Sequence, residues 1–212
     1  MVPSEIQDYL HSLIPEREPL IMEMENYAKE HSVPIMELIG IEALLQLLRL
    51  IQPVSILEIG TAIGYSSIRM VKAIPNVKVV TIERDEERYQ KALYYIERAN
   101  IKDQVEVILG DALEVNLQQS FDVIFIDAAK GQYTKFFEKF EPLLQKNGVV
   151  ISDNVLFKGL VAVNTSDNKR TKNLVKRIQG YNDWLMQNTS YDTTILPIGD
   201  GIAISKQRGE TE

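Results

Sequence analysis

The stretch "VSILEIGTAIGYSS", residues 54–67, decides the fold. Its first half is a run of β-favouring apolar residues with the length of a buried strand. Gly60 and Gly64 follow this run, and a segment with helical patterning begins directly after them. Because glycine adopts the backbone conformations that a tight turn needs, the stretch predicts a strand, a turn and a helix whose first N–H groups face a ligand.

The same alternation of apolar runs and helical patterns continues along the chain. Because strands that alternate with helices form parallel sheets, we expect an α/β fold with right-handed crossovers. The near-continuous apolar character of the runs is typical of strands covered on both faces. Strands are expected at 54–60, 77–83, 104–111, 121–127 and 148–153, and helices at 65–74, 85–99 and 132–145.

The two ends of the chain differ from this pattern. Residues 3–52 have helical patterning in three segments, broken near Pro15 and Pro34, with an apolar stripe that either covers the sheet or forms a dimer contact. After an amphipathic helix that contains Leu174 and Ile178, the chain ends in "YDTTILPIGDGIAISK", residues 191–206. Its Asp-Gly turn between two β-runs predicts an antiparallel hairpin.

The sum of these elements is a doubly wound, mostly parallel seven-stranded sheet of the Rossmann-like kind. We expect one domain over residues 1–212, made of a helical extension, 1–52, and a catalytic core, 53–206.

Composition limits the chemistry. The 212 residues carry a net charge of -7 and no cysteine, which excludes disulfides, thiolate nucleophiles and thiolate metal sites. The only histidines, His11 and His31, lie in a polar N-terminal region, which argues against a histidine metal site or triad. Chemistry must therefore come from carboxylates, amides, lysines or a cofactor. The sequence has neither a long apolar run nor the pattern of a signal peptide, so we expect a cytoplasmic protein without a membrane segment.

A nucleoside cofactor is indicated at the glycine turn. Glu83 ends the next expected strand, 25 residues after Glu58, where a carboxylate can accept ribose hydroxyl groups. The spacing E-x-G-x-x-x-G differs from the dinucleotide fingerprint, whose glycines accommodate a pyrophosphate. A ligand with a ribose and a cationic amino-acid tail but no phosphate suits Glu58 and Glu83, and S-adenosylmethionine is such a ligand. A glycine turn can also be purely structural, but "LGDA", residues 109–112, adds Asp111 for the adenine amino group and Ala112 as space for the ring.

With these motifs the chain resembles the class I methyltransferases, from about residue 34 to residue 206. Met36 is either a cover for the methionine end of the cofactor or core packing, and Arg84 either flanks the adenine or is solvated. The resemblance implies cofactor contacts from Met36, Glu58, Gly60, Thr61, Gly64, Tyr65, Ser66, Glu83, Arg84, Asp111, Ala112 and Asp127.

A metal site is indicated at the ends of two other strands. "FIDAAKGQY", residues 125–133, places Asp127 after the fourth strand, and "ISDNV", residues 151–155, places Asp153 and Asn154 after the fifth. Each residue alone could merely cap a strand, but ligands gather at the carboxyl ends of the strands in a doubly wound sheet. Two carboxylates and an amide oxygen form a hard donor set that suits Mg²⁺, Mn²⁺ or Ca²⁺.

These residues resemble the catechol and caffeoyl-coenzyme A O-methyltransferase family, which binds a divalent metal through the matching side chains. The resemblance implies that Lys130, with Asp127, is catalytic and that Lys130 takes or polarises the proton of the acceptor hydroxyl. It also implies a homodimer formed through the N-terminal helices. A metal and nucleotide sensor on the same fold is the non-enzymatic alternative, but it gives Lys130 no evident role.

The acceptor is indicated by one absent residue and by one basic stretch. The animal catechol enzymes of the family have a glutamate two residues after the final Asp-Gly turn, where this chain has Ala203, so a simple catechol is disfavoured. Residues 168–182, "NKRTKNLVKRIQGYN", carry five cations and no acid, either as a solvated helix face or as a phosphate-binding surface.

Several segments together, among them "VPIMEL" and "SDNVLFKG", resemble bacterial tRNA 5-hydroxyuridine methyltransferases, which form 5-methoxyuridine at the wobble position. A 5-hydroxyuracil offers a chelating oxygen pair as a catechol does, and an extruded anticodon base would reach such a pocket. We therefore expect the tRNA anticodon loop as partner, with Lys169, Arg170 and Lys172 as RNA contacts. The alternative is a small phenolic or caffeoyl-type acceptor.

Overall fold

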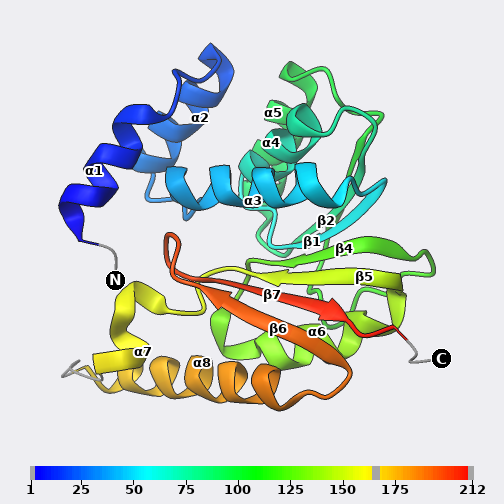
Figure 1. The fold of residues 1–212 in the computed structure, drawn as a ribbon. Helices are drawn as coiled ribbons and strands as arrows, with labels where there is room; N and C mark the ends of the chain where they lie inside the picture. The colour runs from blue at the N-terminus through cyan, green and yellow to red at the C-terminus, as the bar shows by residue number, and fades with distance from the viewer. Residues whose placement is uncertain (1–2, 164–167, 210–212) are drawn as a thin grey trace.

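The computed structural model, which describes residues 3–163 and 168–209, is built around a seven-stranded sheet in the order β3-β2-β1-β4-β5-β7-β6 (Figure 1). The first five strands are parallel, and β7 runs antiparallel to both β5 and β6. This topology confirms the predicted α/β sheet with a C-terminal hairpin. The strands are β1 Ser55–Ile59, β2 Lys78–Glu83, β3 Val105–Leu109, β4 Phe121–Ile126, β5 Leu144–Ser152, β6 Tyr191–Leu196 and β7 Ile202–Gln207.

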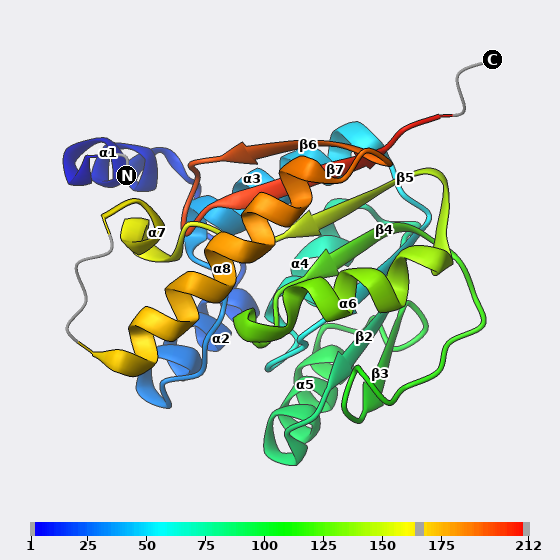
Figure 2. The same cartoon turned by 90° about the horizontal axis from the view of Figure 1, so that it is seen from below.

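Helices cover both faces of the sheet. One face packs against α3, α4 and α5, and the opposite face packs against α6 and α8 (Figures 1 and 2). The α-helices are α1 Ser4–Leu13, α2 Pro19–Glu30, α3 Leu38–Ile51, α4 Tyr65–Ala73, α5 Glu86–Arg98, α6 Tyr133–Phe140, α7 Leu160–Val163 and α8 Lys169–Gln187. Short 3₁₀ turns are η1 Lys130–Gln132, η2 Glu141–Leu143 and η3 Phe157–Gly159.

The core consists of two apolar layers because successive strand residues point to opposite faces. In β1, Ile56 contributes to the layer under α3, α4 and α5, whereas Leu57 and Ile59 contribute to the layer over α6 and α8. All three side chains are almost completely buried. Burial of such a side chain contributes about 1.5–3 kcal/mol, so the apolar runs of the sequence become the central strands.

One predicted boundary is wrong by several residues. The helix expected over 132–145 ends at Phe140, and β5 begins at Leu144 rather than at 148. Pro142 explains the early end, because proline has no N–H to donate to the carbonyl group four residues before it. The chain passes through η2 and enters β5 beside Phe121, with a register irregularity before Val149.

The N-terminal segment forms the three expected helices, separated at Pro15 and Pro34. None of the ten residues of α1 is buried, and an apolar stripe on it, which consists of Ile6, Tyr9, Leu10 and Leu13, is exposed. Within residues 3–163 and 168–209, no helix has both the length and the apolar character needed to cross a membrane.

Candidate active site

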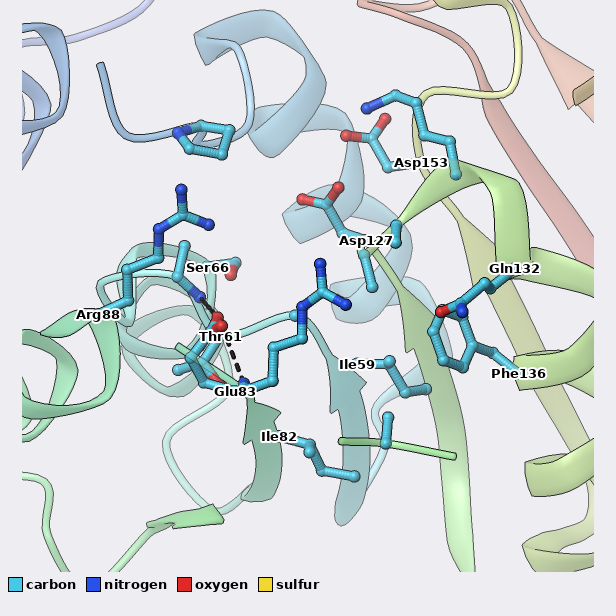
Figure 3. A pocket seen from close by; sticks show the side chains of 18 of the residues that line it. Ile59, Thr61, Ser66, Ile82, Glu83, Arg88, Asp127, Gln132, Phe136 and Asp153 are labelled. Carbon is cyan, nitrogen blue, oxygen red and sulfur yellow. Dashed lines mark hydrogen bonds between the residues drawn. The ribbon is translucent and has the colours of Figure 1, made fainter. Parts of the chain in front are cut away.

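A cavity of about 280 Å³ lies where the strand order reverses between β1 and β4. Ligands of doubly wound folds bind at this switch point, outside the carboxyl ends of the strands. The walls come from the ends of the five parallel strands, β1 to β5, and from the segment that joins α2 to α3. Figure 3 shows this cavity with Glu83 and Thr61 on one side and Asp127 and Asp153 on the other.

The glycine turn joins the two sides of the cavity. Gly60 has a φ of +106°, and a Cβ atom there would lie 2.1 Å from the backbone oxygen of Asp127. Only glycine therefore allows the end of β1 to touch the end of β4. Gly64, with a φ of +82°, is the N-cap residue of α4 but does not itself line the cavity, so its role is to start the helix.

Glu83 is held rigidly at the end of β2. Its carboxylate accepts backbone hydrogen bonds from Ala62 at 2.8 Å, Arg84 at 2.9 Å and Asp85 at 3.0 Å. Charge-assisted hydrogen bonds of this kind are strong, so the carboxylate is fixed before any ligand arrives. Glu83 also lines the cavity. This geometry suits the predicted contact with ribose hydroxyl groups.

Most of the other predicted cofactor residues also line the cavity. Asp111 accepts a hydrogen bond from the N–H of Leu113 at 2.8 Å and lines the cavity beside Ala112. Arg84 lines the cavity as well, and so does Arg88, which was not predicted. The predicted residues that line the cavity are Met36, Gly60, Thr61, Tyr65, Ser66, Glu83, Arg84, Asp111, Ala112 and Asp127.

The structure does not bring Glu58 to the surface of the cavity. Glu58 is fully buried, and it accepts hydrogen bonds from the hydroxyl groups of Ser66, Ser67 and Thr81. Burial raises the pKa of Glu58 to about 7, although the three hydroxyl groups oppose this rise. The expected direct contact with the cofactor therefore becomes an indirect one, in which Glu58 holds Ser66 in place.

Asp127, Asp153, Asn154 and Lys130 meet at the other side of the cavity. In Figure 3 the carboxylates of Asp127 and Asp153 lie next to each other. The amide nitrogen of Asn154 donates to Asp153 at 2.6 Å, and within residues 3–163 and 168–209 no side-chain hydrogen bond uses the amide oxygen of Asn154. Among the described residues no group of three or more His, Cys, Asp or Glu side chains could hold a metal, so the predicted set has two carboxylates and depends on the amide.

The surroundings of Asp127 and Asp153 disfavour the ionised form of both carboxyl groups. Burial raises the pKa of Asp127 to about 6; the charge of Lys130 opposes this rise and that of Asp200 adds to it. Burial and the charge of Asp127 raise the pKa of Asp153 well above its usual value. Like charges that share a buried site cannot both ionise easily unless a cation compensates them.

Three side chains that the sequence analysis missed brace the loop that carries Asp153. The hydroxyl of Tyr133 donates to the backbone oxygen of Asp153 at 3.0 Å. Tyr181, from α8, shares a hydrogen bond of 2.7 Å with Ser152, and Asn182 donates to the backbone oxygen of Val155 at 2.8 Å. The apolar spacing of α8 places Tyr181 in the core, but no local pattern reveals its partner.

A second hollow adjoins the cavity and is strongly basic. Among the described residues that line it, Arg84, Lys130, Lys169, Arg170 and Arg177 are cationic and none is acidic. The two predicted RNA contacts Lys169 and Arg170 are thus brought beside Lys130, whereas the third, Lys172, does not line the hollow. Arg177, one of the five cations of the basic stretch but not one of the three predicted RNA contacts, also lines the hollow, and a Cβ atom on Gly131 would lie 2.8 Å from its guanidinium.

Fold and cavity together define a class I methyltransferase with a Rossmann-like sheet. A family model described as O-methyltransferase matches residues 11–208. The chain therefore belongs to the O-methyltransferase family, and the predicted enzyme class, an S-adenosylmethionine-dependent O-methyltransferase, is confirmed.

Individual relatives agree with this assignment. The chain is 32% identical to a catechol O-methyltransferase of Niastella koreensis, with 94% of this chain and 95% of the relative covered. A caffeoyl-CoA O-methyltransferase of Stellaria longipes is 27% identical, with coverages of 92% and 86%. A Bacillus cereus O-methyltransferase solved with S-adenosylhomocysteine superposes with a TM-score of 0.81 at 28% identity, with 96% of this chain and 97% of that chain covered.

Proposed function

We propose that the protein is a divalent-metal-dependent O-methyltransferase that moves the methyl group of S-adenosylmethionine to a hydroxyl with a neighbouring oxygen. The observation that carries the proposal is the meeting of Asp127, Asp153 and Asn154 with Lys130 in the cavity that Glu83 and Asp111 also line. A cofactor on the Glu83 side would thus lie beside an acceptor on the Asp153 side. Holding two reactants in this way supplies the orientation that methyl transfer needs.

The residues present fit a hard divalent cation. Asp127, Asp153 and the amide oxygen of Asn154 are oxygen donors, which Mg²⁺, Mn²⁺ and Ca²⁺ prefer. Burial is the largest cause of the raised pKa values of both carboxylates, and a bound cation would offset the cost of ionising them. A cation bound there would lower the pKa of a coordinated acceptor hydroxyl.

Lys130 lies in η1, directly after β4, and lines both the cavity and the basic hollow. In the proposed reaction it takes or polarises the proton of the acceptor hydroxyl. The charge of Lys130 opposes the rise that burial causes in the pKa of Asp127, so the two side chains attract each other on one side of the cavity.

We propose 5-hydroxyuridine at the wobble position of tRNA as the acceptor, with 5-methoxyuridine as the product. The basic hollow supports this proposal, because its five cations lie beside the cavity in a chain of net charge -7. Phosphates of an anticodon loop would neutralise these cations while the extruded base enters the cavity.

A small phenolic or caffeoyl-type acceptor is the second candidate, supported by the names of the catechol and caffeoyl-CoA relatives. The position that would distinguish a simple catechol carries Ala203, which is fully buried in β7 and has no group that could bind a second hydroxyl. Of the phenolic acceptors, a caffeoyl thioester with phosphates would use the basic hollow and a free catechol would not.

The test is a direct competition between acceptors. Purified enzyme with S-adenosylmethionine and Mg²⁺ is offered tRNA that carries 5-hydroxyuridine, caffeoyl-coenzyme A or catechol, and methylated products are quantified. The proposal expects 5-methoxyuridine in the tRNA at the highest kcat/KM. Efficient methylation of caffeoyl-coenzyme A with none of the tRNA would replace the RNA acceptor by the phenolic one, and unchanged 5-methoxyuridine in cells without the enzyme would exclude the RNA acceptor.

We also propose that the protein forms a homodimer through its N-terminal helices. The exposed apolar stripe of α1 supports this, since such a stripe is usually covered in an assembly. Light scattering after gel filtration should give twice the mass of one chain, and Leu10→Lys should give the mass of one chain. A monomeric mass for the unaltered protein at micromolar concentration would contradict the proposal.

A further inference from the structure

A chain of polar contacts connects the N-terminal helices to α4. The guanidinium of Arg17, which precedes α2, donates to both carboxylate oxygens of Glu25, at 3.2 Å and 2.8 Å. Glu25 accepts a hydrogen bond of 2.8 Å from the hydroxyl of Tyr65, which in turn accepts one of 2.9 Å from Arg69. Arg69 also pairs with Glu42 of α3. The chain thus joins α2, α3 and α4 with two positive and two negative charges.

Tyr65 gives this chain of contacts a direct connection to the cavity. It is the first residue of α4, follows the glycine turn and lines the cavity, while its hydroxyl is occupied by Glu25 and Arg69. A phenol has one proton, and Arg69 can only donate, so the proton of Tyr65 must point to Glu25. Because Arg17 donates to both oxygens of Glu25 as well, neither oxygen carries a proton, and Glu25 is ionised. Burial opposes its charge, but hydrogen bonds from Arg17 and Tyr65 lower the pKa of Glu25.

The position of α2 determines one wall of the cavity. The chain leaves α2 with a hydrogen bond from Val33 to the backbone oxygen of Ala28 and then runs through Pro34, Ile35 and Met36, which all line the cavity. The wall at 34–36 comes from no strand of the sheet. Met36 is buried in the core layer on this side of the sheet and Ile35 packs against that layer, while α2 and α3 flank the segment, so a change in the position of α2 against α4 acts on this wall.

We propose that Glu25 is a positioning residue for the cofactor, which locks α2 onto Tyr65 and so closes the 34–36 wall over the site. Glu25 does not line the cavity and acts only through Tyr65. This inference rests on the cofactor site alone and requires neither the metal nor the acceptor of the proposed function.

The same helix offers a matched control. Glu23, two residues before Glu25, pairs with Arg98 of α5 and has no contact with Tyr65 among its hydrogen bonds in the described part of the chain. Glu23 and Glu25 are thus both paired with an arginine on another segment, and only Glu25 leads to the cavity. If α2 merely needs to be attached to the core, the two glutamates should matter equally.

The experiment measures S-adenosylhomocysteine binding by calorimetry in the presence of a chelator. Glu25→Gln should weaken binding roughly fivefold to tenfold, as the loss of one charged, partly buried hydrogen bond does. Tyr65→Phe, which keeps the ring, should weaken binding similarly. The loss of binding free energy in the double variant should be smaller than the sum of the losses in the two single variants. Glu23→Gln should change the affinity by less than about twofold.

Equal weakening by Glu23→Gln and Glu25→Gln would overturn the proposal, as would unchanged binding by Glu25→Gln. Should Glu25→Gln fail to fold, Tyr65→Phe decides in the same way.

Hydrogen exchange provides the structural readout, since amides of residues 33–37 should exchange faster in Glu25→Gln and not in Glu23→Gln. With an active acceptor, KM for S-adenosylmethionine should rise while kcat stays within about twofold, because binding lost equally in ground and transition states affects KM. A fall in kcat at unchanged KM would contradict the positioning role.

Discussion

The carboxyl edge of the sheet has two halves that differ in how their charges are satisfied. In the cofactor half, at the ends of β1, β2 and β3, Glu83 accepts three backbone hydrogen bonds and Glu58 accepts three from hydroxyl groups. In the acceptor half, at the ends of β4 and β5, the half-buried Asp127 and the buried Asp153 repel each other. The carboxylates of the cofactor half thus have their partners within the protein, whereas in the proposed function a cation completes the acceptor half.

This difference separates two kinds of preorganisation. Internal hydrogen bonds hold the carboxylates of the cofactor half in place whether or not a ligand is present. Unneutralised like charges make the acceptor half dependent on its ligands, because a buried charge without a partner is costly. Changes in one half should therefore affect one function and spare the other.

The largest effect is expected for Asp153→Ala. This change removes a proposed metal ligand, so kcat should fall by about a thousandfold or more, while the affinity for S-adenosylhomocysteine changes by less than about threefold. Steady-state kinetics and calorimetry on the same preparation measure both. Asp153→Asn keeps the volume of the side chain and should be nearly as inactive. An Asp153→Ala enzyme that keeps its activity without metal would remove the distinction between the halves.

Glu58→Gln tests the completeness of the cofactor half. Because burial raises the pKa of Glu58 to about 7, from 4.5 in the unfolded chain, the folded protein holds this proton longer than the unfolded one does. The contribution of Glu58 to stability therefore decreases as pH rises from 4.5 to about 7, by about 3 kcal/mol. Urea unfolding across this range should show the decrease in the unaltered protein and a smaller one in Glu58→Gln. Identical pH profiles would show that Glu58 ionises as easily as in water.

The pH dependence of metal binding tests the acceptor half. Burial raises the pKa values of Asp127, to about 6, and of Asp153, so protons compete with a cation below these values. Affinity for Mn²⁺ should therefore increase about thirtyfold between pH 5.5 and pH 7.5, with release of protons. Electron paramagnetic resonance of free Mn²⁺ measures the affinity. S-adenosylhomocysteine binding in the same buffers is the control for the cofactor half, and a Mn²⁺ affinity that is independent of pH would place the metal elsewhere.

The smallest effect concerns the basic hollow. Arg170→Gln and Arg177→Gln should each lower kcat/KM for tRNA by about tenfold at low salt and reduce its salt dependence. Lys176→Gln is the matched control, because Lys176 belongs to the same helix and does not line the hollow. Equal effects of all three changes would indicate attraction by overall charge instead of a defined surface.

Local patterns in the sequence predict much of this site. The ends of apolar runs identify Asp127, Asp153 and Asn154, because side chains at parallel strand ends must meet at one edge of the sheet. Gly60 could be predicted for a similar reason, although its contact with Asp127 could not.

Other features depend on packing between distant segments. Glu58 was expected in the cavity, but the alternation of side chains along β1 places it under α4. There the hydroxyl groups of Ser66 and Ser67 donate hydrogen bonds to its carboxylate, which depends on how α4 packs on the sheet. Arg177 reaches the site only because α8 packs against η1, and Glu25 is 40 residues away from Tyr65. No periodicity in the sequence reports such contacts.

The central claim is that a cation completes the acceptor half alone, and removal of metal tests it most directly. One enzyme preparation is freed of metal with a chelator, verified by elemental analysis, and divided between S-adenosylhomocysteine calorimetry and turnover of tRNA or caffeoyl-coenzyme A with and without added Mg²⁺. We expect cofactor affinity within about twofold of the untreated enzyme and turnover that disappears and returns with Mg²⁺. Turnover that persists in the verified metal-free enzyme would contradict the account.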